Sequence, residues 1–247
     1  MNKLAFALLA LTAGTSHAML IDRGGGLIYD DVLNITWLQD ANYAKTSGYD
    51  ADGKMPWAQA KEWAANLAYY DSVRKVVWDD WRLPAINPVN GVSINYVFSY
   101  DGSSDYGYNI GAAGTMYEGS KGSELAFMYY DNLGIPAGYD TNGNPTGCDA
   151  AYPYSCLPAT TLPILNLAAD AYWADAEYAP NATQAWWFVF NRGYQESVSK
   201  EAEPMAWAVR DGDVAPIDPA PIPEPSTLAL LLAGLLQLGF YMGKANQ

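Results

Sequence analysis

The spacing of apolar residues predicts a helix early in the chain. Between residues 57 and 67, apolar side chains recur three or four positions apart, which is the period of one helical face: Trp57, Ala60, Ala64 and Leu67, with Trp63 flanking them. Pro56 fits the first turn, where its missing N–H costs no hydrogen bond. We therefore expect a polar loop followed by a helix in this region.

A second helix is predicted within residues 120–134. Ser123 is a suitable N-cap and Gly134 a suitable stop, and the apolar face between them comprises Leu125, Met128 and Tyr129. The preceding segment, 90–122, is rich in Gly, Ser, Asp and Tyr. We expect that segment to be a loop.

Aromatic and β-branched segments predict strands on both sides of these helices. A short strand, a turn at Asp30-Asp31 and a second strand through Trp37 are expected near the start. Four late segments have the same character: 171–175, 185–190, 194–199 and 205–212. Asn191-Arg192-Gly193 is typical of a hairpin turn between two of them. Two early helices and a late antiparallel meander predict one α+β domain.

Apolar segments at the two ends are expected to lie outside this domain. Residues 1–18 have the layout of a secretory signal peptide, with Lys3 ahead of an apolar stretch and cleavage expected between Ala18 and Met19. Residues 215–226 form a Pro-rich linker, and 227–243 are an uncharged apolar run about long enough to cross a bilayer. We therefore expect a globular domain at 19–214 that is exported and held at a membrane.

The C-terminal pattern resembles a known sorting signal. Pro223-Glu224-Pro225, followed by a Leu-rich run at the end of the chain, is similar to the PEP-CTERM signal of bacterial exported proteins. The resemblance implies recognition by an exosortase and cleavage near the triplet. It also implies a Gram-negative host that makes exopolysaccharide. The protein would be anchored transiently in the inner membrane and then reach the cell surface or extracellular matrix.

The charge of the domain argues against one class of partner. Only Lys3, Lys244 and Glu224 lie outside residues 19–222, which leaves 26 of the 27 acidic and 11 of the 13 basic residues inside. This balance repels phosphate backbones, so we expect no binding to nucleic acid. It also disfavours highly sulfated polyanions.

The residue inventory excludes several kinds of chemistry. The single histidine, His17, lies in the predicted signal peptide, so the mature chain has no Ser-His-Asp or Cys-His catalysis and no histidine-ligated metal. Cys148 and Cys156 are the two cysteines. In an exported protein such a closely spaced pair predicts a disulfide, since a structural metal needs more ligands than two thiolates.

A second resemblance covers most of the chain, from about Leu27 to Val214. It rests on the order of six motifs: GLIYDDVLNITWLQDANYA, MPWAQAKEWAANL, DWRLP, SELAFMYYDNLG, YWADAEYAPNATQAWWFVFNRGYQ and AWAVRDGDV. Together they are similar to the C-terminal domain of the Lcl collagen-like adhesin, a domain common in PEP-CTERM proteins. The resemblance implies an α+β fold related to C-type-lectin-like domains, and polysaccharide binding. It supplies no catalytic residues.

Two kinds of residue are candidate ligand contacts. Trp186 and Trp187 point to opposite faces if they lie on a strand, so one is expected in the core and the other covered by a loop or exposed as a platform for sugars. Arg82 and Arg210 are the other candidates, with ion pairs to Asp80 or Asp211 as the alternative. Four tryptophans in the motifs are expected to be packing residues: Trp37, Trp63, Trp81 and Trp207.

Two further kinds of site are considered, a metal site and a pair of catalytic carboxylates. The loops 49–54 and 139–144 carry oxygen-bearing residues in a calcium-like order, but Pro145 and Ala151 break the EF-hand pattern of the second loop. An irregular calcium site or simple Asx turns remain, and no cofactor is expected otherwise. Asp175 with Glu177, or Asp79 with Asp80, would be the pairs for a glycosidase.

These observations leave three hypotheses. The favoured one is a non-enzymatic binding or matrix protein that interacts with exopolysaccharide or other glycans. The alternatives are a carboxylate-dependent, polysaccharide-active hydrolase and a purely structural surface protein. A deep cleft with two carboxylates would favour the hydrolase, whereas a shallow, exposed Trp/Tyr face would favour glycan binding.

Overall fold

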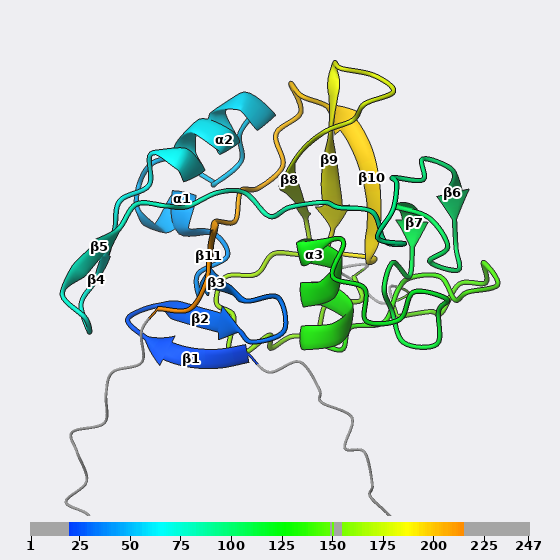
Figure 1. The fold of residues 1–247 in the computed structure, drawn as a ribbon, viewed down its shortest axis with the longest axis horizontal. Helices are drawn as coiled ribbons and strands as arrows, with labels where there is room; N and C mark the ends of the chain where they lie inside the picture. Colours follow the sequence, from blue (N-terminus) through cyan, green and yellow to red (C-terminus); the bar gives the residue numbers. More distant parts are fainter. Residues whose placement is uncertain (1–19, 149, 151–154, 215–247) are drawn as a thin grey trace, which may run out of the picture. The chain divides into compact units, whose positions relative to one another are not determined.

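Two sheets and a short hairpin make up most of the regular structure (Figure 1). The computed structural model describes residues 20–148, 150 and 155–214, which form an α+β domain with more strand than helix. The predicted signal peptide and its cleavage site lie outside the described residues. So do the Pro-rich linker, the triplet Pro223-Glu224-Pro225 and the apolar run 227–243. None of the helices within the described ranges is long and apolar enough to span a bilayer.

The first sheet is four-stranded and antiparallel. Its order is β1 (Leu20–Gly24), β2 (Leu27–Asp30), β3 (Ile35–Leu38) and β11 (Val209–Asp211). The predicted early hairpin is thus confirmed as β2 and β3, while β1 was not predicted. Of the segment 205–212, only β11 is a strand. Met205 is hydrogen-bonded instead to the start of β8, where its N–H donates to the carbonyl of Ala171 and its carbonyl accepts from Trp173.

The second sheet has five strands in the order β6-β7-β10-β9-β8. The predicted late meander is confirmed in its last three strands, which are β8 (Ala171–Glu177), β9 (Gln184–Val189) and β10 (Tyr194–Ser199). The hairpin turn before Tyr194 is confirmed too, and Gly193 adopts its positive φ of 67°. The prediction that residues 90–122 form a loop is wrong in part. It contains β6 (Phe98–Ser99) and β7 (Tyr106–Tyr108), which pair in parallel with each other.

The helices are shorter than the apolar pattern suggested. Besides α1 (Tyr43–Thr46), α2 spans Trp57–Ala65, so Leu67 lies beyond it, and Pro56 is its N-cap with an extended ψ of 152°. The second predicted helix is confirmed as α3 (Glu124–Phe127) with Ser123 as its N-cap, continued by the π-helical η1 (Met128–Asn132). A further hairpin, β4 (Tyr69–Asp71) with β5 (Val76–Trp78), was not predicted.

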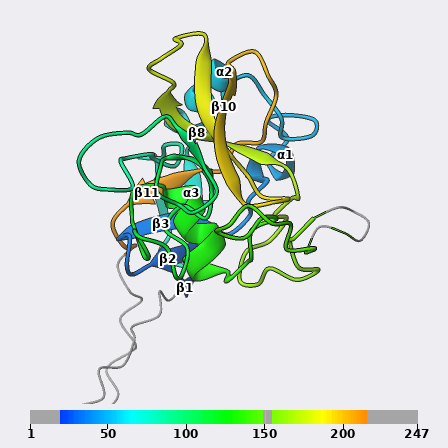
Figure 2. The ribbon, with the colours of Figure 1, turned by 90° about the vertical axis from the view of Figure 1, so that its right-hand side faces the viewer.

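Aromatic residues join the two sheets into one core. Trp207 lies between Trp37 of the first sheet, at a ring-centroid distance of 4.5 Å, and Tyr172 of the second, at 5.9 Å. All four tryptophans expected to be packing residues are at most 3% exposed: Trp37, Trp63, Trp81 and Trp207. The helix α3–η1 also connects the sheets, which lie on different sides of it in Figure 2.

Two side-chain hydrogen bonds make this connection. Ser123 donates to Gln195 on β10, and Asn132 donates to Asp30 on β2. The two donors, Ser123 and Asn132, are the N-cap of α3 and the last residue of η1. One helical segment is therefore hydrogen-bonded to both sheets and sets the spacing between them.

One half-buried carboxylate on η1 makes stability depend on pH. Burial, together with the charges of Glu118 and Asp30, raises the pKa of Asp131 to about 6, from an ordinary value of 3.8. Its Oδ2 is buried and has no hydrogen-bond partner within the described ranges. The protonated form therefore stabilises the fold. This contribution is complete below the ordinary pKa and is lost as the pH rises through about 6.

We therefore expect Asp131→Asn to be more stable than the wild type above pH 7, by about 1–2 kcal/mol after allowance for solvent screening. The difference should shrink as the pH falls towards 4. Urea unfolding across this range measures it, and Asp79→Asn, which removes an exposed carboxylate, controls for net charge. A difference that stays constant with pH would contradict the assignment.

Candidate functional site

A continuous series of ring contacts runs from the β6–β7 edge of the five-stranded sheet across β10 and β9 to the residue that follows β8. We call it the aromatic strip. Neighbouring ring centroids in it are 4.9–6.2 Å apart. Its nine members are Tyr96, Phe98, Tyr100, Tyr106, Tyr108, Tyr139, Tyr178, Trp186 and Tyr194. Aromatic rings at such distances attract one another in preferred orientations, so the rings of the strip hold one another in place.

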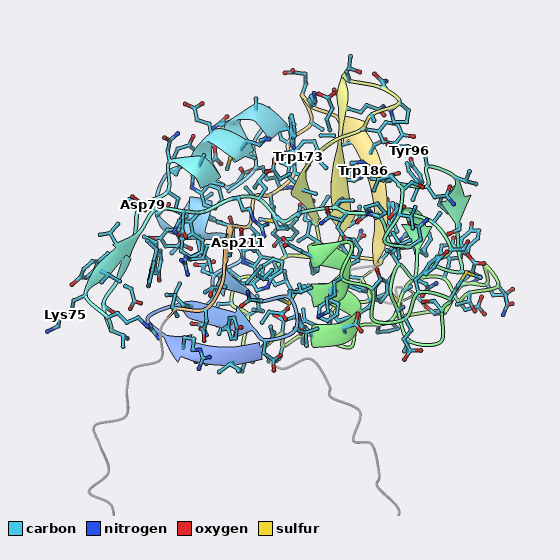
Figure 3. The ribbon with its side chains drawn as sticks, viewed as in Figure 1. Lys75, Asp79, Tyr96, Trp173, Trp186 and Asp211 are labelled. Atoms are coloured by element: carbon cyan, nitrogen blue, oxygen red, sulfur yellow. A yellow bond between two sulfur atoms is a disulfide. The ribbon has the colours of Figure 1, made fainter. Side chains whose placement is uncertain are left out.

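Three members of the strip are open to solvent, and buried rings lie beneath them. Tyr96 is 36% exposed, Phe98 46% and Tyr100 37%. Tyr96 stacks on the buried Trp186 with 21° between the ring planes, and Tyr100 stacks on Tyr108 with 11°. Figure 3 shows Tyr96 beside Trp186. The exposed rings are therefore held at fixed orientations and present apolar surface at little cost in entropy.

A buried carboxylate fixes the loop that carries Tyr96. Asp105 is 1% exposed, and its two oxygens accept the backbone N–H of Val89 at 2.6 Å and of Asn95 at 2.7 Å. Gln195 of β10 donates to the Asp105 carbonyl. Burial raises the pKa of Asp105, although these backbone hydrogen bonds oppose the rise. One side chain thus ties the loop to the sheet immediately before Tyr96.

Glycine is required where β6 meets β7. Gly107 has a φ of 129°, and a Cβ at that position would lie within 3 Å of the carbonyl carbon and the nitrogen of Ser99 and still closer to its oxygen. The approach of the two backbones places Phe98 on Tyr106 and Tyr100 on Tyr108. The exposed rings of the strip depend on this contact.

A cavity of about 370 Å³ adjoins the strip at Tyr139. Asn109 lines it and connects it to the strip, because its Nδ2 donates to the carbonyls of Tyr100 at 2.7 Å and Tyr139 at 2.9 Å. Asp140 and Thr146 add polar groups to the lining. The turn after Asp140 packs on the strip, since a Cβ on Gly143 would lie 3.0 Å from the Tyr100 ring. The cavity and the strip thus form one continuous site.

The predicted disulfide between Cys148 and Cys156 is present, and it supports one wall of this cavity. The backbone N–H of Cys156 donates to the carbonyl of Asn191 in the β9–β10 turn at 2.7 Å. On the other side of the bridge, Thr146 donates to the carbonyl of Ala137. The disulfide therefore connects the cavity wall to the five-stranded sheet.

We expect Cys148→Ser/Cys156→Ser to lower the free energy of unfolding by about 2–3 kcal/mol, since the bridge closes a short loop with a sequence separation of 8. Denaturant unfolding measures this loss. The wild type under reducing conditions should match the variant. Equal stability of the oxidised wild type and the variant would show that the bridge contributes nothing.

Of the two tryptophans singled out by sequence, Trp186 belongs to the strip but is buried, and Trp187 is not a member of it. Trp186 is 2% exposed and lies beneath Tyr96, while Trp187 is half-buried and contacts Trp173 at 6.3 Å. The prediction that one of the pair lies in the core is confirmed. The exposed rings were missed because their segment was expected to be a loop. The signal was the alternation of aromatic residues at 96, 98 and 100 and again at 106 and 108, which has the period of a strand.

The two candidate arginines make ion pairs within the domain. Arg82 pairs with Asp211 at 2.6 Å and with Glu124 at 2.8 Å. Arg210 pairs with Asp80 at 2.7 Å, and its guanidinium lies 4.2 Å from the centre of the Trp78 ring. Both pairs expected as the alternative to ligand binding are therefore present. Glu124 was not anticipated as a partner.

The other candidate oxygens are also engaged. Asp140 accepts the N–H groups of Asn142 and Asn144, and Asp50 accepts those of Asp52 and Gly53, so both calcium-like loops form Asx turns. Within the described ranges, no group of three or more His, Cys, Asp or Glu side chains is placed to hold a metal ion.

Three of the four suspected catalytic carboxylates have cationic partners; Asp80 pairs with Arg210, as described above, and Asp79 is exposed. Asp175 pairs with Lys61, and Glu177 pairs with Lys200, both at 2.5 Å. Both lysines also lie over the Trp57 ring, at 4.7 Å from its centre. These contacts form a charged cluster between α2, β8 and the end of β10, in which Glu177 directly precedes Tyr178 of the strip.

Comparison with protein-family models, with curated proteins and with solved structures finds no match to this chain.

Proposed function

We propose that this protein is a non-catalytic glycan-binding module and that the aromatic strip is its binding surface. The observation that carries the proposal is the row of exposed rings at Tyr96, Phe98 and Tyr100, each in contact with other rings of the strip. Sugar rings present apolar C–H faces that pack on such flat aromatic surfaces. A glycan chain laid along the strip would cover several rings at once.

The exposure of the strip, and the ion pairs of two suspected catalytic carboxylates, support binding more than hydrolysis. The strip is a surface feature with three exposed rings, whereas a glycosidase needs two carboxylates flanking the scissile bond. The suspects Asp175 and Glu177 are held in ion pairs with Lys61 and Lys200. We therefore favour binding over catalysis.

The proposal includes the fold relationship and the export route that the two sequence resemblances imply. The resemblance to the Lcl adhesin domain supports a C-type-lectin-like relationship and polysaccharide binding. The PEP-CTERM resemblance supports export, anchoring through 227–243, exosortase processing and a role beside exopolysaccharide.

Binding to immobilised polysaccharides tests the proposal. We expect the purified protein to be retained by at least one class among neutral, acidic and amine-bearing polymers, with and without calcium. Retention should be lost on competition with soluble oligosaccharides of the same polymer. Failure to bind any class would favour the purely structural alternative.

A further inference from the structure

The cavity beside Tyr139 differs chemically from the rest of the site. At about 370 Å³ it lies near the lower end of the range for small-ligand sites, which suits one sugar unit rather than a long segment. Its lining combines the apolar side chains of Ile135 and Ala137 with polar groups from Asn109 and Thr146. An amphipathic sugar matches such a mixed wall.

Asp140 is the one charged residue among the described residues that line the cavity. Its carboxylate is fixed by the N–H groups of Asn142 at 2.9 Å and Asn144 at 2.8 Å, and by the side-chain amide of Asn144. The bonds from Asn144 lower the pKa of Asp140, so the group stays ionised in mild acid. A fixed carboxylate favours a cationic group on the ligand.

The rest of the strip has the same sign of charge. Asp101 follows Tyr100 and is exposed, and the carboxylate of Glu196 lies close enough to Tyr106 and Tyr194 to raise the pKa of both, after the larger effect of burial. Arg192 packs its Cβ and Cγ against Gly138 but is not among the described residues that line the cavity. Arg192 also acts on Tyr194 of the strip, so the negative charge that faces a ligand is clearest at Asp140, inside the cavity, and it is there that an amine is favoured over an anionic sugar.

We propose that the cavity takes one amino-sugar unit whose protonated amine is bound by Asp140, so that amine-bearing polysaccharides are the preferred ligand class of the aromatic strip. This inference rests on the proposed glycan-binding function and adds the identity of the ligand class. The strip supplies affinity for the chain, and Asp140 supplies selectivity for free over acetylated amines.

Calorimetry with two matched probes tests the inference. The probes are a hexasaccharide of β-1,4-linked glucosamine and its fully N-acetylated counterpart, at about pH 5.5, where sugar amines carry a proton. The full chain is kept soluble with a mild detergent because of its apolar run. We expect the wild type to bind the amine form about 10-fold more tightly, as a charge-assisted hydrogen bond predicts. Asp140→Asn should bring the two affinities within about 2-fold.

Asp50→Asn is the matched control. Asp50 caps an Asx turn of the same kind and carries the same charge, but it lies in a loop outside the strip and the cavity. We expect it to keep the wild-type preference. If both variants lose the preference equally, net charge is responsible and the inference is wrong.

The two proposals fail in different ways. If neither hexasaccharide nor any polysaccharide binds, the proposed function itself is wrong. If the wild type binds both probes equally and loss of Tyr96 and Tyr100 weakens both, the strip binds glycans but the amine selectivity of the cavity is refuted.

Discussion

Replacing Tyr96 and Tyr100 by alanine should weaken glycan binding about 50- to 100-fold, with about 10-fold from each ring. The reason is that each ring is exposed, flat and stacked on another ring of the strip, on Trp186 and Tyr108 respectively. Aromatic anchors of this kind are typical binding hot spots, worth about 1–2 kcal/mol or more each. Affinity electrophoresis or calorimetry with the polysaccharide that the wild type binds measures the loss.

Tyr70→Ala is the matched control for this experiment. Tyr70 is more exposed than either ring, at 59%, but it lies on β4 in the hairpin at the opposite end of the domain from the strip (Figure 1). Its loss should leave binding unchanged. Wild-type affinity in the double variant, with thermal unfolding unchanged, would exclude the strip as the binding surface.

Glu124→Ala should lower the free energy of unfolding by about 3 kcal/mol. The carboxylate of Glu124 is nearly buried and accepts two hydrogen bonds from Arg82 at 2.8 Å and one from the backbone N–H of Ala85 at 2.7 Å. Burial disfavours the charge on Arg82, but Glu124 and then Asp211 outweigh it and raise the pKa of the guanidinium. Removing Glu124 leaves a part-buried cation and an unpaired N–H group. Denaturant unfolding measures the loss.

Asp211→Ala controls for the simple loss of an Arg82 partner. The Asp211 side chain is 81% exposed, so this pair should contribute less than about 1 kcal/mol. A further variant, Arg82→Met/Glu124→Leu, should recover most of the stability, because an apolar pair replaces the ion pair without an orphaned charge. A loss below about 1 kcal/mol in Glu124→Ala would contradict a structural role for this pair.

These two predictions concern residues that the sequence treated differently. Arg82 was identified as a candidate from its motif, and the structure adds that it holds the segment before Ala85 against the N-terminus of α3 through Glu124. Tyr96 and Tyr100 were not identified, because the Gly, Ser and Asp residues of their segment favoured a loop and the strand-like alternation of the aromatic residues was overlooked. These residues are ordered by the five-stranded sheet, in which β6 pairs with β7 and β7 pairs with β10, a strand almost a hundred residues later in the chain.

Local pattern alone determined several features of this protein. The Ser123 cap, the turn at Gly193, the early hairpin and the Cys148–Cys156 bridge all follow from short-range rules of capping, turn geometry and cysteine spacing. The expectation that one of the two adjacent tryptophans is buried followed from the two-residue period of a strand. Each of these features depends on residues at most about ten positions apart.

Tertiary structure alone decided the site. Gln195 of β10 donates to the carbonyl of Asp105, Trp186 of β9 lies beneath Tyr96, and Asn109 donates to the carbonyl of Tyr139. The exposure of a ring depends on what packs over it, and this is set by contacts between segments far apart in the chain. Periodicity carries no information about such contacts, so the aromatic composition was visible in the sequence but the surface that it forms was not.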